Sequence, residues 1–588
     1  MTSIPLRVLG LAIVAAGLAC AEVPAGEGEG DEGEGEGEGT EGEGEGEGEG
    51  EASTFAGLVL NEITCAGDNG VGDYVELTNT SATELSFDGV ILTDDPNNLA
   101  QRMTLRGTLA AGAFTSISPT FGVSCTDTLS LLRPDGVVVD VVTLPGSDEL
   151  TEGAGHGRLP DGSGAFTTTS ATPGAANQAF VDASDVLFQP LQNPFRIDLT
   201  ISAAGEAALR DGATEFAYVD GTFKLSGNGL DDPVLTVGLR KKGKVGSRRG
   251  FDQKMAWKID FDRVLPDQKY RRISKLNLNN MVQDPSTVHE YMAYRMIEDA
   301  GLPTPRLGAA TVFVNGVEFG TYLMIEAFDD DLYLKRGFPV GLLSLFEGGL
   351  TEAACCDFTD LLPEEITRFE HDGGDEVIGR AALVELSNRL NGAAPEDVFT
   401  ALDPILDWEQ ALTTMATEAV IGHWDGYQVS PNNFYLHLGV DQKWRLIASG
   451  VDQTFGHEGR VDVVFNGNGR LYQRCRENAT CSALYHDKLT EAVARADALL
   501  AGSFEDDVDA VVQLHMTTFS SARLESSLDN IPFLKGDAFA YLNERLVILK
   551  QALACDGLGD RDDCTVDVGN GPEPLRCGDF EGGRGCVD

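Results

Sequence analysis

Residues 421–456 read IGHWDGYQVSPNNFYLHLGVDQKWRLIASGVDQTFG. The order of loop, strands and polar residues in this stretch says more about the fold than any other part of the sequence. Two strand-like runs, 434–438 and 444–447, are separated by a short polar turn and predict a β-hairpin. A hairpin folds the chain back on itself, so we expect Asp452 to lie beside Asp425. The stretch therefore predicts two carboxylates that meet in space.

A helix is expected directly before this stretch. Residues 407–421 repeat apolar side chains at helical spacing and run into the loop that carries Asp425. Asn433 follows a few residues later, before the hairpin delivers Asp452. Phosphoryl transfer uses the same order, in which one Asp meets the acceptor hydroxyl and an Asn and a second Asp hold metal. The simpler interpretation is that Asp425 only caps the end of the helix.

Residues 240–275 form a basic segment in an otherwise acidic chain. They contain thirteen Lys or Arg and only four Asp. The segment begins with a glycine-bearing turn at Gly243, and residues 254–261 then alternate like a strand that carries Lys254. Backbone N–H groups of such a turn can approach phosphate, and a strand lysine supplies the charge. The alternative is a basic face that is simply solvated.

A helix and a hairpin are expected after the basic segment. Asp284 and Pro285 open a helix that Gly301 ends, and its Glu290 is placed to form an ion pair with Lys254. Residues 311–326 alternate like two strands around an Asn-Gly pair, which is the preferred type I′ hairpin turn. The predicted order is therefore glycine turn, lysine strand, helix and hairpin.

The region from about residue 186 to the 540s carries many motifs in a fixed order. They are Arg240-Lys241-Lys242-Gly243, Asp252-Gln253-Lys254, Lys275-Leu276-Asn277-Leu278-Asn279-Asn280, Asp284-Pro285-Ser286, Gly301-Leu302-Pro303-Thr304-Pro305, Gly320-Thr321-Tyr322-Leu323-Met324-Ile325-Glu326, Trp424-Asp425-Gly426-Tyr427, Asn432-Asn433-Phe434-Tyr435-Leu436 and Asp452-Gln453-Thr454-Phe455-Gly456. Together these motifs resemble the CotH kinase family, the spore-coat kinases and their secreted relatives.

The resemblance implies an α+β, atypical protein-kinase-like domain of two lobes over residues 186–554. It also implies ATP with Mg or Mn as cofactor and transfer of phosphate to Ser or Thr of a protein substrate. Asp425 would orient or deprotonate the acceptor hydroxyl, and Asn433 and Asp452 would bind metal. Lys254 would anchor the nucleotide phosphate, with Lys258 in reserve. The other cofactor-binding candidates are Arg240, Lys242, Gly243, Glu290 and Glu326.

One departure from the family pattern concerns the second strand of the 434–447 hairpin. Many members end it with Pro-Trp-Asp-x-Asp, whereas here Gly450 replaces the first acid and only Asp452 remains. Loss of a carboxylate weakens a magnesium site, so an inactive copy is a second hypothesis. The sequence predicts that Gly450→Asp would restore a metal ligand, unless Gly450 adopts a tight conformation that Asp would destabilise.

Residues 55–178 predict a separate β domain, because short strand-like runs alternate with Gly, Asn and Asp. Its motifs are Asn61-Glu62-Ile63, Asp73-Tyr74-Val75-Glu76-Leu77-Thr78-Asn79, Leu131-Leu132-Arg133-Pro134-Asp135-Gly136, Gly157-Arg158-Leu159-Pro160-Asp161-Gly162 and Thr172-Pro173-Gly174-Ala175-Ala176-Asn177. They resemble the lamin tail domain, which implies an immunoglobulin-like β-sandwich without catalytic residues.

Two features of this β domain bear on its stability and binding. Cys65 and Cys125 are its only cysteines, and we expect them to form a disulfide that closes a loop of about 60 residues. Asp73 and Glu76 admit two interpretations, as calcium ligands or as solvated acids at a strand edge. The second is favoured.

Composition excludes one class of partner. The 588 residues include 43 Lys or Arg against 94 Asp or Glu, a net charge of -51. Such a charge repels phosphate backbones, so we expect no nucleic acid as a partner. The hydrophobic fraction of 42% is sufficient for several folded cores.

The N-terminus predicts export. In residues 1–21, Arg7 precedes an apolar run that is too short to span a bilayer, as in a signal peptide. Cys20 is a lipidation candidate, and cleavage after Ala21 is the alternative. Residues 22–54 alternate Gly and Glu and predict an extended tether. We therefore expect an exported protein, either a cell-surface or outer-membrane lipoprotein held only by a lipid anchor, or a secreted protein.

The remaining cysteines fit an oxidising compartment. Cys475 and Cys481 predict a disulfide in a loop beside a helix, whereas Cys355 and Cys356 are adjacent and open to several pairings. The Cys-rich acidic tail, 555–588, contains four cysteines whose spacing favours two disulfides over a zinc site. They are Cys555, Cys564, Cys577 and Cys586.

Three functional hypotheses follow from the sequence. The leading one is a surface-tethered kinase that phosphorylates a surface or secreted protein, with the β domain able to meet a surface or matrix partner. The second keeps the kinase-like domain as an inactive scaffold for adhesion. The third is a structural surface component whose acidic faces bind calcium.

Overall fold

The computed structural model describes residues 55–65, 73–146, 150, 153–212, 214–244, 246–350, 358–456 and 467–555, with the backbone of 563–567, 572–580 and 583–587. The predicted export signal, the lipidation candidate Cys20, the tether, Cys355 and Cys356 lie outside these residues. Within the described ranges, no helix is long and apolar enough to cross a membrane.

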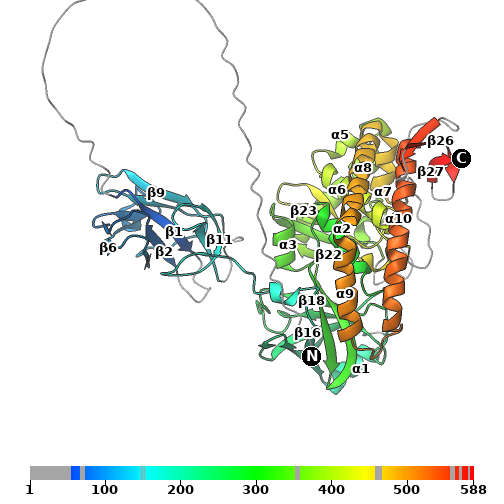
Figure 1. Ribbon diagram of the computed structural model, residues 1–588, viewed down its shortest axis with the longest axis horizontal. Coiled ribbons are helices and arrows are strands. Elements are labelled where there is room, and N and C mark those ends of the chain that lie inside the picture. Colours follow the sequence, from blue (N-terminus) through cyan, green and yellow to red (C-terminus); the bar gives the residue numbers. More distant parts are fainter. Residues whose placement is uncertain are drawn as a thin grey trace, which may run out of the picture. The chain divides into compact units, whose positions relative to one another are not determined.

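The first folded body is rich in β-structure, as predicted (Figure 1). Its larger sheet has six antiparallel strands, in the order β12 (Gln178–Ala179), β11 (Ala165–Ser170), β10 (Ala154–Leu159), β1 (Leu58–Thr64), β2 (Tyr74–Asn79) and β7 (Phe114–Ile117). A second sheet contains β5 (Arg102–Thr104), β4 (Ile91–Thr93), β8 (Thr128–Leu132) and β9 (Val138–Thr143). A short pair is formed by β3 (Leu85–Ser86) and β6 (Thr108–Leu109).

Two links join the sheets of this body. Asp140 on β9 accepts a hydrogen bond from the backbone N–H of Leu60 on β1, with an N–O distance of 2.9 Å, and forms an ion pair with Arg158 on β10 at 3.2 Å. The predicted disulfide between Cys65 and Cys125 is confirmed. In the chain-entropy model, a cross-link of this span stabilises the fold by about 4 kcal/mol.

Neither interpretation of Glu76 is correct, because the side chain is fully buried in β2. Its carboxylate accepts hydrogen bonds from Asn61 Nδ2 at 3.0 Å and from the backbone N–H of Gly174 at 2.6 Å. The same segment beyond β11 is held by Glu62, which accepts from the Thr172 N–H at 2.8 Å. These acids fasten the closing segment of the body, so they are neither solvated nor available to calcium.

The second body begins with an eight-stranded sheet, called here the large sheet. Its order is β13 (Phe195–Ile201), β19 (Leu307–Val314), β20 (Val317–Glu326), β18 (Lys275–Asn279), β17 (Ala256–Asp260), β16 (Leu235–Lys242), β14 (Val219–Gly227) and β15 (Leu230–Asp231). Helices α1 (Ala203–Arg210) and α2 (His289–Asp299) belong to the same region. The predicted hairpin is confirmed, and Asn315 and Gly316 both have positive φ, as a type I′ turn requires. The predicted helix is present, but it begins at His289 and not at Asp284 and Pro285.

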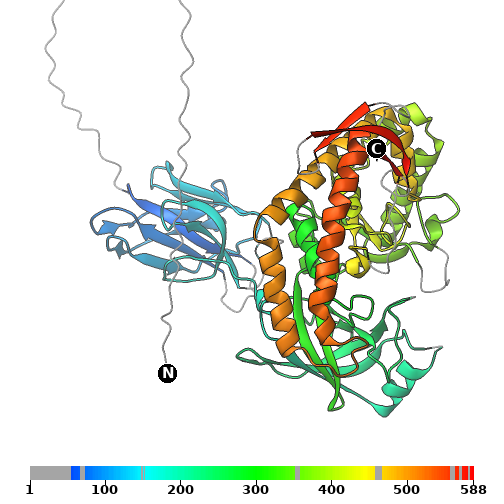
Figure 2. The same ribbon diagram turned by 45° about the vertical axis from the view of Figure 1, so that its right-hand side comes forward.

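A second, four-stranded sheet, the small sheet, contains β22 (Glu370–Gly374), β21 (Leu342–Gly348), β23 (Phe434–Gly439) and β24 (Trp444–Ala448). The helices that follow the large sheet are α3 (Asp331–Gly337), α4 (Glu376–Gly392), α5 (Val398–Leu402), α6 (Trp408–Ile421), α7 (Arg470–Glu477), α8 (Ala479–Ala501), α9 (Phe504–Thr518) and α10 (Ile531–Cys555). Figure 2 shows α9 and α10, in orange, extending from the other helices to the large sheet.

Helix α6 positions the Asp425 loop. Asp407 caps its first turn by accepting a hydrogen bond from the Gln410 N–H at 3.2 Å, and twelve of its fourteen residues are buried. Gly422 ends the helix with φ of +64°, a conformation that glycine adopts without strain. The helix and the hairpin predicted on either side of Asp425 are therefore both confirmed.

The second predicted disulfide is present, but not in a loop. Cys475 and Cys481 are bonded, with Cys475 in α7 and Cys481 in α8. Only Asn478 separates the two helices, and its side chain caps α8 by accepting from the Cys481 N–H at 3.0 Å. Sequence spacing alone could not place the corner between two helices there.

The tail forms a three-stranded antiparallel sheet of β25 (Asp563–Asp567), β26 (Pro572–Phe580) and β27 (Gly583–Val587). Cys577 and Cys586 are opposite one another in its register. Cys555 is buried at the end of α10. The pairing of the tail cysteines stays a prediction.

Candidate active site

A cleft lies between the large and small sheets and collects most of the predicted site residues. The large sheet and α2 contribute Lys242, Asn279 and Glu290 to its lining. The segments around the small sheet contribute Asp425, Asn433 and Asp452, the three residues predicted to carry phosphoryl transfer. Arg240, Gly243 and Lys258 line it as well.

Lys242 is the lysine that is linked to Glu290, on the same wall of the cleft. Its Nζ donates to Asn279 Oδ1 at 2.9 Å, and Asn279 Nδ2 donates to Glu290 Oε1 at 2.8 Å. Burial raises the pKa of Glu290 well above its usual value, Asp452 raises it further, and Lys242 opposes the shift. Burial likewise lowers the pKa of Lys242, against the attraction of Glu290 and Asp452. The charges of these three groups are therefore linked.

Lys254, the predicted phosphate anchor, lies elsewhere. It precedes β17, is only 1% exposed, and its Nζ sits 5.2 Å from the centre of the Tyr322 ring. Among the described residues its Nζ has no hydrogen-bond partner. The predicted pair between Lys254 and Glu290 is thus wrong. The cause is that β17 begins at Ala256, so the alternation expected from residue 254 starts two residues too early.

The burial of Lys254 makes a prediction about stability. Burial lowers its pKa from 10.5 to about 7, with Glu525 opposing the shift. Between these pH values the unfolded chain holds a proton that the folded chain lacks, so folding becomes less favourable as pH falls from 10.5 to 7. Lys254→Met should therefore raise the free energy of unfolding by about 1–4 kcal/mol at pH 7 and below.

The gain from Lys254→Met should shrink as pH rises toward 10.5, because the wild-type lysine is then neutral in both states. Urea unfolding at pH 6.5, 8 and 9.5 measures this trend. Lys443→Met is a matched control, since Lys443 lies in the turn between β23 and β24. A stability difference that does not change with pH would show that the ammonium is not the cause.

Glu326 is the other predicted cofactor residue that lies outside the cleft lining. It is fully buried, and it accepts a hydrogen bond from the Arg306 N–H at 2.8 Å. Its carboxylate also forms ion pairs with the guanidinium groups of Arg306, at 2.5 Å, and Arg336. The geometry gives Glu326 a structural role at the end of β20.

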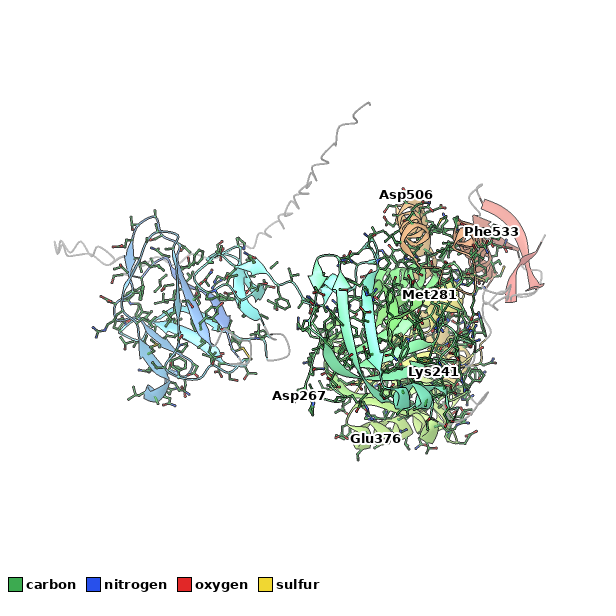
Figure 3. The ribbon with its side chains drawn as sticks, turned by 90° about the horizontal axis from the view of Figure 1, so that it is seen from below. Lys241, Asp267, Met281, Glu376, Asp506 and Phe533 are labelled. Atoms are coloured by element: carbon green, nitrogen blue, oxygen red, sulfur yellow. A yellow bond between two sulfur atoms is a disulfide. The ribbon has the colours of Figure 1, made fainter. Side chains whose placement is uncertain are left out.

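Most of the basic segment is neutralised by ion pairs inside the protein. Lys241, labelled in Figure 3, is 2% exposed and pairs with the buried Glu215. Arg271 forms an ion pair with Asp232 at 2.8 Å, and other basic residues of the segment also form ion pairs with Asp side chains. The segment is therefore not a solvated basic face. Lys258 lines the cleft while its Nζ contacts Asp329 at 2.8 Å.

Asp425 is held by two asparagines. Asn432 Nδ2 donates to Asp425 Oδ1 at 3.1 Å, and Asn433 Nδ2 donates to Oδ2 and to the Asp425 backbone oxygen, both at 3.0 Å. Beneath the loop, the buried Glu418 of α6 accepts from the Gln428 N–H at 3.1 Å. Asp425 is consequently fixed by more than the end of α6, so it is not merely a helix cap.

Asp452 is a second carboxylate of the cleft whose pKa is raised. Its pKa is raised to about 7, mainly by burial. The charges of Asp284 and Asp425 add to this shift, and Lys242 opposes it. The residue lies in the turn η5 (Val451–Gln453), and its backbone oxygen is 3.3 Å from His289 Nδ1 of α2. Asp284 was predicted only to open a helix, and its approach to Asp452 was not predicted.

The donor set fits a divalent cation that is also bound by phosphate. Glu290 Oε2 and Asn277 Oδ1 are buried at the cleft and lack a hydrogen-bond partner within the described residues. Because Asn433 donates its amide N–H groups to Asp425, its oxygen remains on the other side of the amide. Across the described part of the chain, no group of three or more Asp, Glu, His or Cys is arranged as a metal site. Mg²⁺ needs only one or two carboxylates when phosphates and water complete its shell.

Gly450 has φ of +59° and ψ of +44°, the left-handed conformation. A Cβ atom there would lie 2.6 Å from Asn433 Oδ1. The residue is also not in a strand, because β24 ends at Ala448. Residues 450 and 452 therefore do not share the face of a strand, which the predicted restoration of a metal ligand by Gly450→Asp would require.

We expect Gly450→Asp to lower the melting temperature and weaken metal-dependent nucleotide binding, because the new side chain displaces Asn433. The expected loss of stability is about 1–3 kcal/mol. Gly229→Asp is the matched control, since Gly229 also has positive φ, of +87°, but no atom within 4 Å of an added Cβ. Tighter manganese binding by Gly450→Asp, measured by calorimetry, would instead support a missing carboxylate.

A further contact crosses the cleft near its glycine turn. Lys244 Nζ lies 3.0 Å from Glu347 Oε1 at the end of β21, and both residues line the cleft. Phe328 and Tyr435 stack in the lining, with ring centres 5.1 Å apart. The sequence offered no signal for these pairs, because each joins segments about 100 residues apart.

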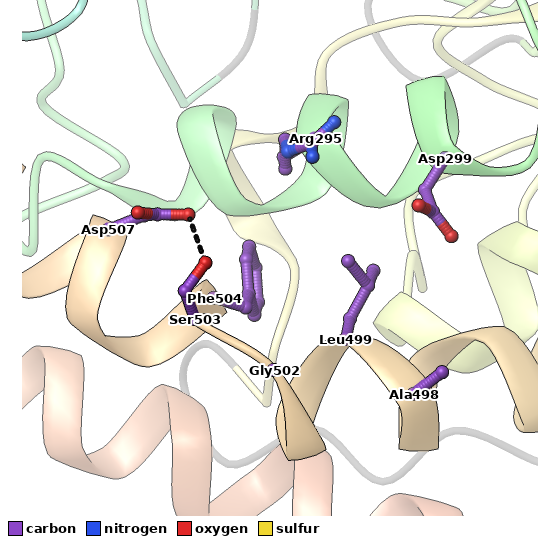
Figure 4. Close-up of a pocket in the computed structure, with 8 residues that line it drawn as sticks. All are labelled: Arg295, Asp299, Ala498, Leu499, Gly502, Ser503, Phe504 and Asp507. Atoms are coloured by element: carbon purple, nitrogen blue, oxygen red, sulfur yellow. Dashed lines mark hydrogen bonds between the residues drawn. The ribbon is translucent and has the colours of Figure 1, made fainter. Parts of the chain in front are cut away.

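A smaller hollow lies between α2 and the junction of α8 with α9 (Figure 4). Three of its polar side chains, those of Arg295, Ser503 and Asp507, are engaged with one another or with neighbours. Ser503 Oγ bonds Asp507 Oδ2 at 3.2 Å, and Arg295 pairs with Glu298 at 3.0 Å. It contains none of the predicted site residues, so the cleft is the candidate active site.

Comparison with known proteins supports the CotH resemblance of part of the chain. Residues 239–531 match the family model for CotH kinase protein. Over 251 residues the chain is 22% identical to Invasin CotH2 of Rhizopus delemar, a match that covers 40% of this chain and 41% of that relative. The chain therefore spans less than half the length of the curated relative it matches. These findings confirm the CotH resemblance for this region, whereas the lamin tail resemblance stays a prediction.

One solved structure is similar at a low level. The HipA–HipB–operator DNA complex of the Shewanella oneidensis MR-1 toxin–antitoxin system matches with 11% identity and covers 55% of this chain and 65% of that chain. Its TM-score is 0.22, which is too low to carry an argument.

Proposed function

We propose that this chain is an exported CotH-type kinase that transfers the terminal phosphate of ATP to a Ser or Thr hydroxyl of a surface or secreted protein. One observation carries the proposal. A single cleft holds the linked charges of Lys242 and Glu290 on one wall and Asp425, Asn433 and Asp452 on the other. Kinases need this opposition of a phosphate-binding lysine and metal-binding acids around the nucleotide.

In the proposed reaction Asp425 meets the acceptor. Its carboxylate, oriented by Asn432 and Asn433, accepts the hydroxyl proton as the acceptor oxygen bonds to the γ-phosphorus. The bond between the γ-phosphorus and the bridging oxygen breaks, and ADP leaves. Lys242 offsets phosphate charge, and Asn279 together with Glu290 keeps its ammonium in place.

Magnesium or manganese would be held by Asp452 and the Asn433 oxygen, with Asp425 beside them. The bound ion supplies charge that stabilises the phosphates during transfer. The raised pKa of Asp452 fits this role, because burial and neighbouring negative charge destabilise the ionised carboxylate until a cation binds.

The test is phosphate incorporation by the full chain from γ-labelled ATP with manganese. Label that withstands acid and appears on Ser or Thr supports the proposal. Absence of label on the chain itself and on a mixture of exported proteins, together with absence of nucleotide binding, would contradict it.

A second candidate function is adhesion at a surface. It rests on the relative that is named an invasin and on the separate β-rich body, which would meet a surface or matrix partner. In that case the cleft would bind nucleotide weakly or not at all. Both candidates place the protein outside the cytoplasm, tethered through Cys20 or secreted.

A further inference from the structure

The segment that joins α9 to the region before α10, residues 519–525, lies against the large sheet and is called here the latch. Its first contacts are with β20. The Ser520 N–H donates to Thr321 Oγ1 at 2.9 Å, and Ser520 Oγ donates to Glu318. Since α9 and α10 pack with the helices around the small sheet, the latch connects the two walls of the cleft (Figure 2).

Arg523 is the centre of the latch. Its Nη1 donates to the backbone oxygens of Phe251 and Gln253, both at 2.9 Å. Its guanidinium carbon lies 3.5 Å from the centre of the Phe319 ring. One arginine therefore holds the turn before β17 and stacks on β20 at the same time.

The backbone of the latch lies in direct contact with the backbone of β20. Gly320 has φ of +95°, and a Cβ atom there would lie 2.2 Å from the Ala522 backbone oxygen. Only glycine permits this approach. The contact is thus built into the strand and does not depend on flexible side chains.

The last contact leads back to the cleft. Glu525 forms a bidentate pair with Arg249, and Arg249 Nη1 donates to the backbone oxygens of Gly246 and Arg248 at 2.8 and 2.9 Å. Gly246 lies directly against the side chain of Gln283, which lines the cleft. A chain of contacts therefore runs from the latch through Arg249 to Gly246, beside the cleft.

We propose that the latch positions the basic turn, residues 246–253, for nucleotide binding, with Arg523 as the principal positioning residue and Glu525 as a lesser one. This inference rests on the proposed function, because the latch would control how well the same cleft binds nucleotide. Arg523 dominates because its two hydrogen bonds are charge-assisted and its plane covers an aromatic ring. Glu525 contributes less because it is 45% exposed, and exposed ion pairs are weak.

The experiment compares full-length wild type with Arg523→Ala, Arg523→Lys and Glu525→Gln. Arg495→Ala is the control, because Arg495 also forms an ion pair, with Glu491 on α8, but touches neither the latch nor the cleft. Three quantities are measured: amide hydrogen exchange of residues 246–253, affinity for a non-hydrolysable ATP analogue with manganese, and the melting temperature.

Arg523→Ala should speed exchange in residues 246–253 and weaken the analogue affinity by about tenfold. Arg523→Lys should have an intermediate effect, and Glu525→Gln should weaken affinity by less than about threefold. If Arg523→Ala does not fold, Arg523→Lys carries the same comparison. If Arg523→Ala shows the same hydrogen exchange and analogue affinity as Arg495→Ala, the proposed role of the latch is contradicted. Absence of analogue binding by wild type would overturn the proposed function, while the exchange comparison would still test the latch.

Discussion

Replacement of Asp425 by Asn is expected to lower phosphate transfer by about 10²–10⁴-fold, the range that general-base catalysis contributes. The carboxylate is held by two asparagine amides, so it is aimed at one position in the cleft and cannot be replaced by a mobile neighbour. An amide of the same shape keeps the packing but cannot accept the hydroxyl proton. Affinity for the ATP analogue should change little, because the phosphates are met mainly by Lys242 and the metal.

The measurement is the initial rate of labelling from γ-labelled ATP, with analogue affinity determined on the same preparations. Asp441→Asn is the matched control, since Asp441 lies in the turn after β23 and its partners among the described residues, Lys443 and Arg445, belong to the same hairpin. Asp425→Asn with full labelling would remove this residue from the mechanism. Loss of labelling together with loss of analogue affinity would instead give Asp425 a role in binding.

Lys242→Met is expected to weaken affinity for the ATP analogue by about 10–100-fold, whereas Lys254→Met should leave it unchanged. A charge-assisted hydrogen bond to phosphate contributes about 1.5–3 kcal/mol, which corresponds to this range. Lys242 lines the cleft and is linked to Glu290 through Asn279, whereas Lys254 is enclosed against Tyr322. The two lysines thus form a matched pair.

Calorimetric titration with the analogue and manganese separates the outcomes. Equal losses of affinity for both substitutions would mean that the basic segment attracts the phosphates through its summed charge and not through one lysine. A larger loss for Lys254→Met would restore the assignment made from the sequence. Melting temperatures of both variants must be measured, because Lys254→Met is expected to stabilise the fold.

The order of parts around the cleft could be predicted from the sequence, because it depends on local signals. Helical spacing predicted α6, the Asn315-Gly316 pair predicted the β19–β20 turn, and the hairpin predicted the approach of Asp452 to Asp425. Asp425 is one of the neighbours that raise the pKa of Asp452, which agrees with the predicted approach of the two residues.

The choice of lysine could not be predicted, because it depends on where a strand begins. Lys242 and Lys254 are equally basic in the sequence, and only the pairing of β16 with β17, in which Lys242 is opposite Ala256, places one of them in the cleft. Asp284 and Glu347 were missed for a related reason. Asp284 belongs to a quoted motif but was predicted only to open a helix, and Glu347 was not marked at all. Both approach the site through contacts between segments far apart in the chain.

Gly450 shows the same limit for backbone conformation. Its replacement of an expected acid looked like the loss of a metal ligand, but a positive φ is invisible in a single sequence. The left-handed conformation and the close approach to Asn433 both favour glycine, so the missing carboxylate has a conformational reason in this chain.

The central claim is that the cleft binds nucleotide through a metal held by Asp452. Titration of the full chain with the ATP analogue, with and without manganese, tests it most directly, with Asp452→Asn beside wild type. We predict that wild type binds the analogue at least about tenfold more tightly with manganese than without, and that Asp452→Asn loses this difference. Binding by wild type that is equally tight without manganese, or no binding in either condition, would contradict the account.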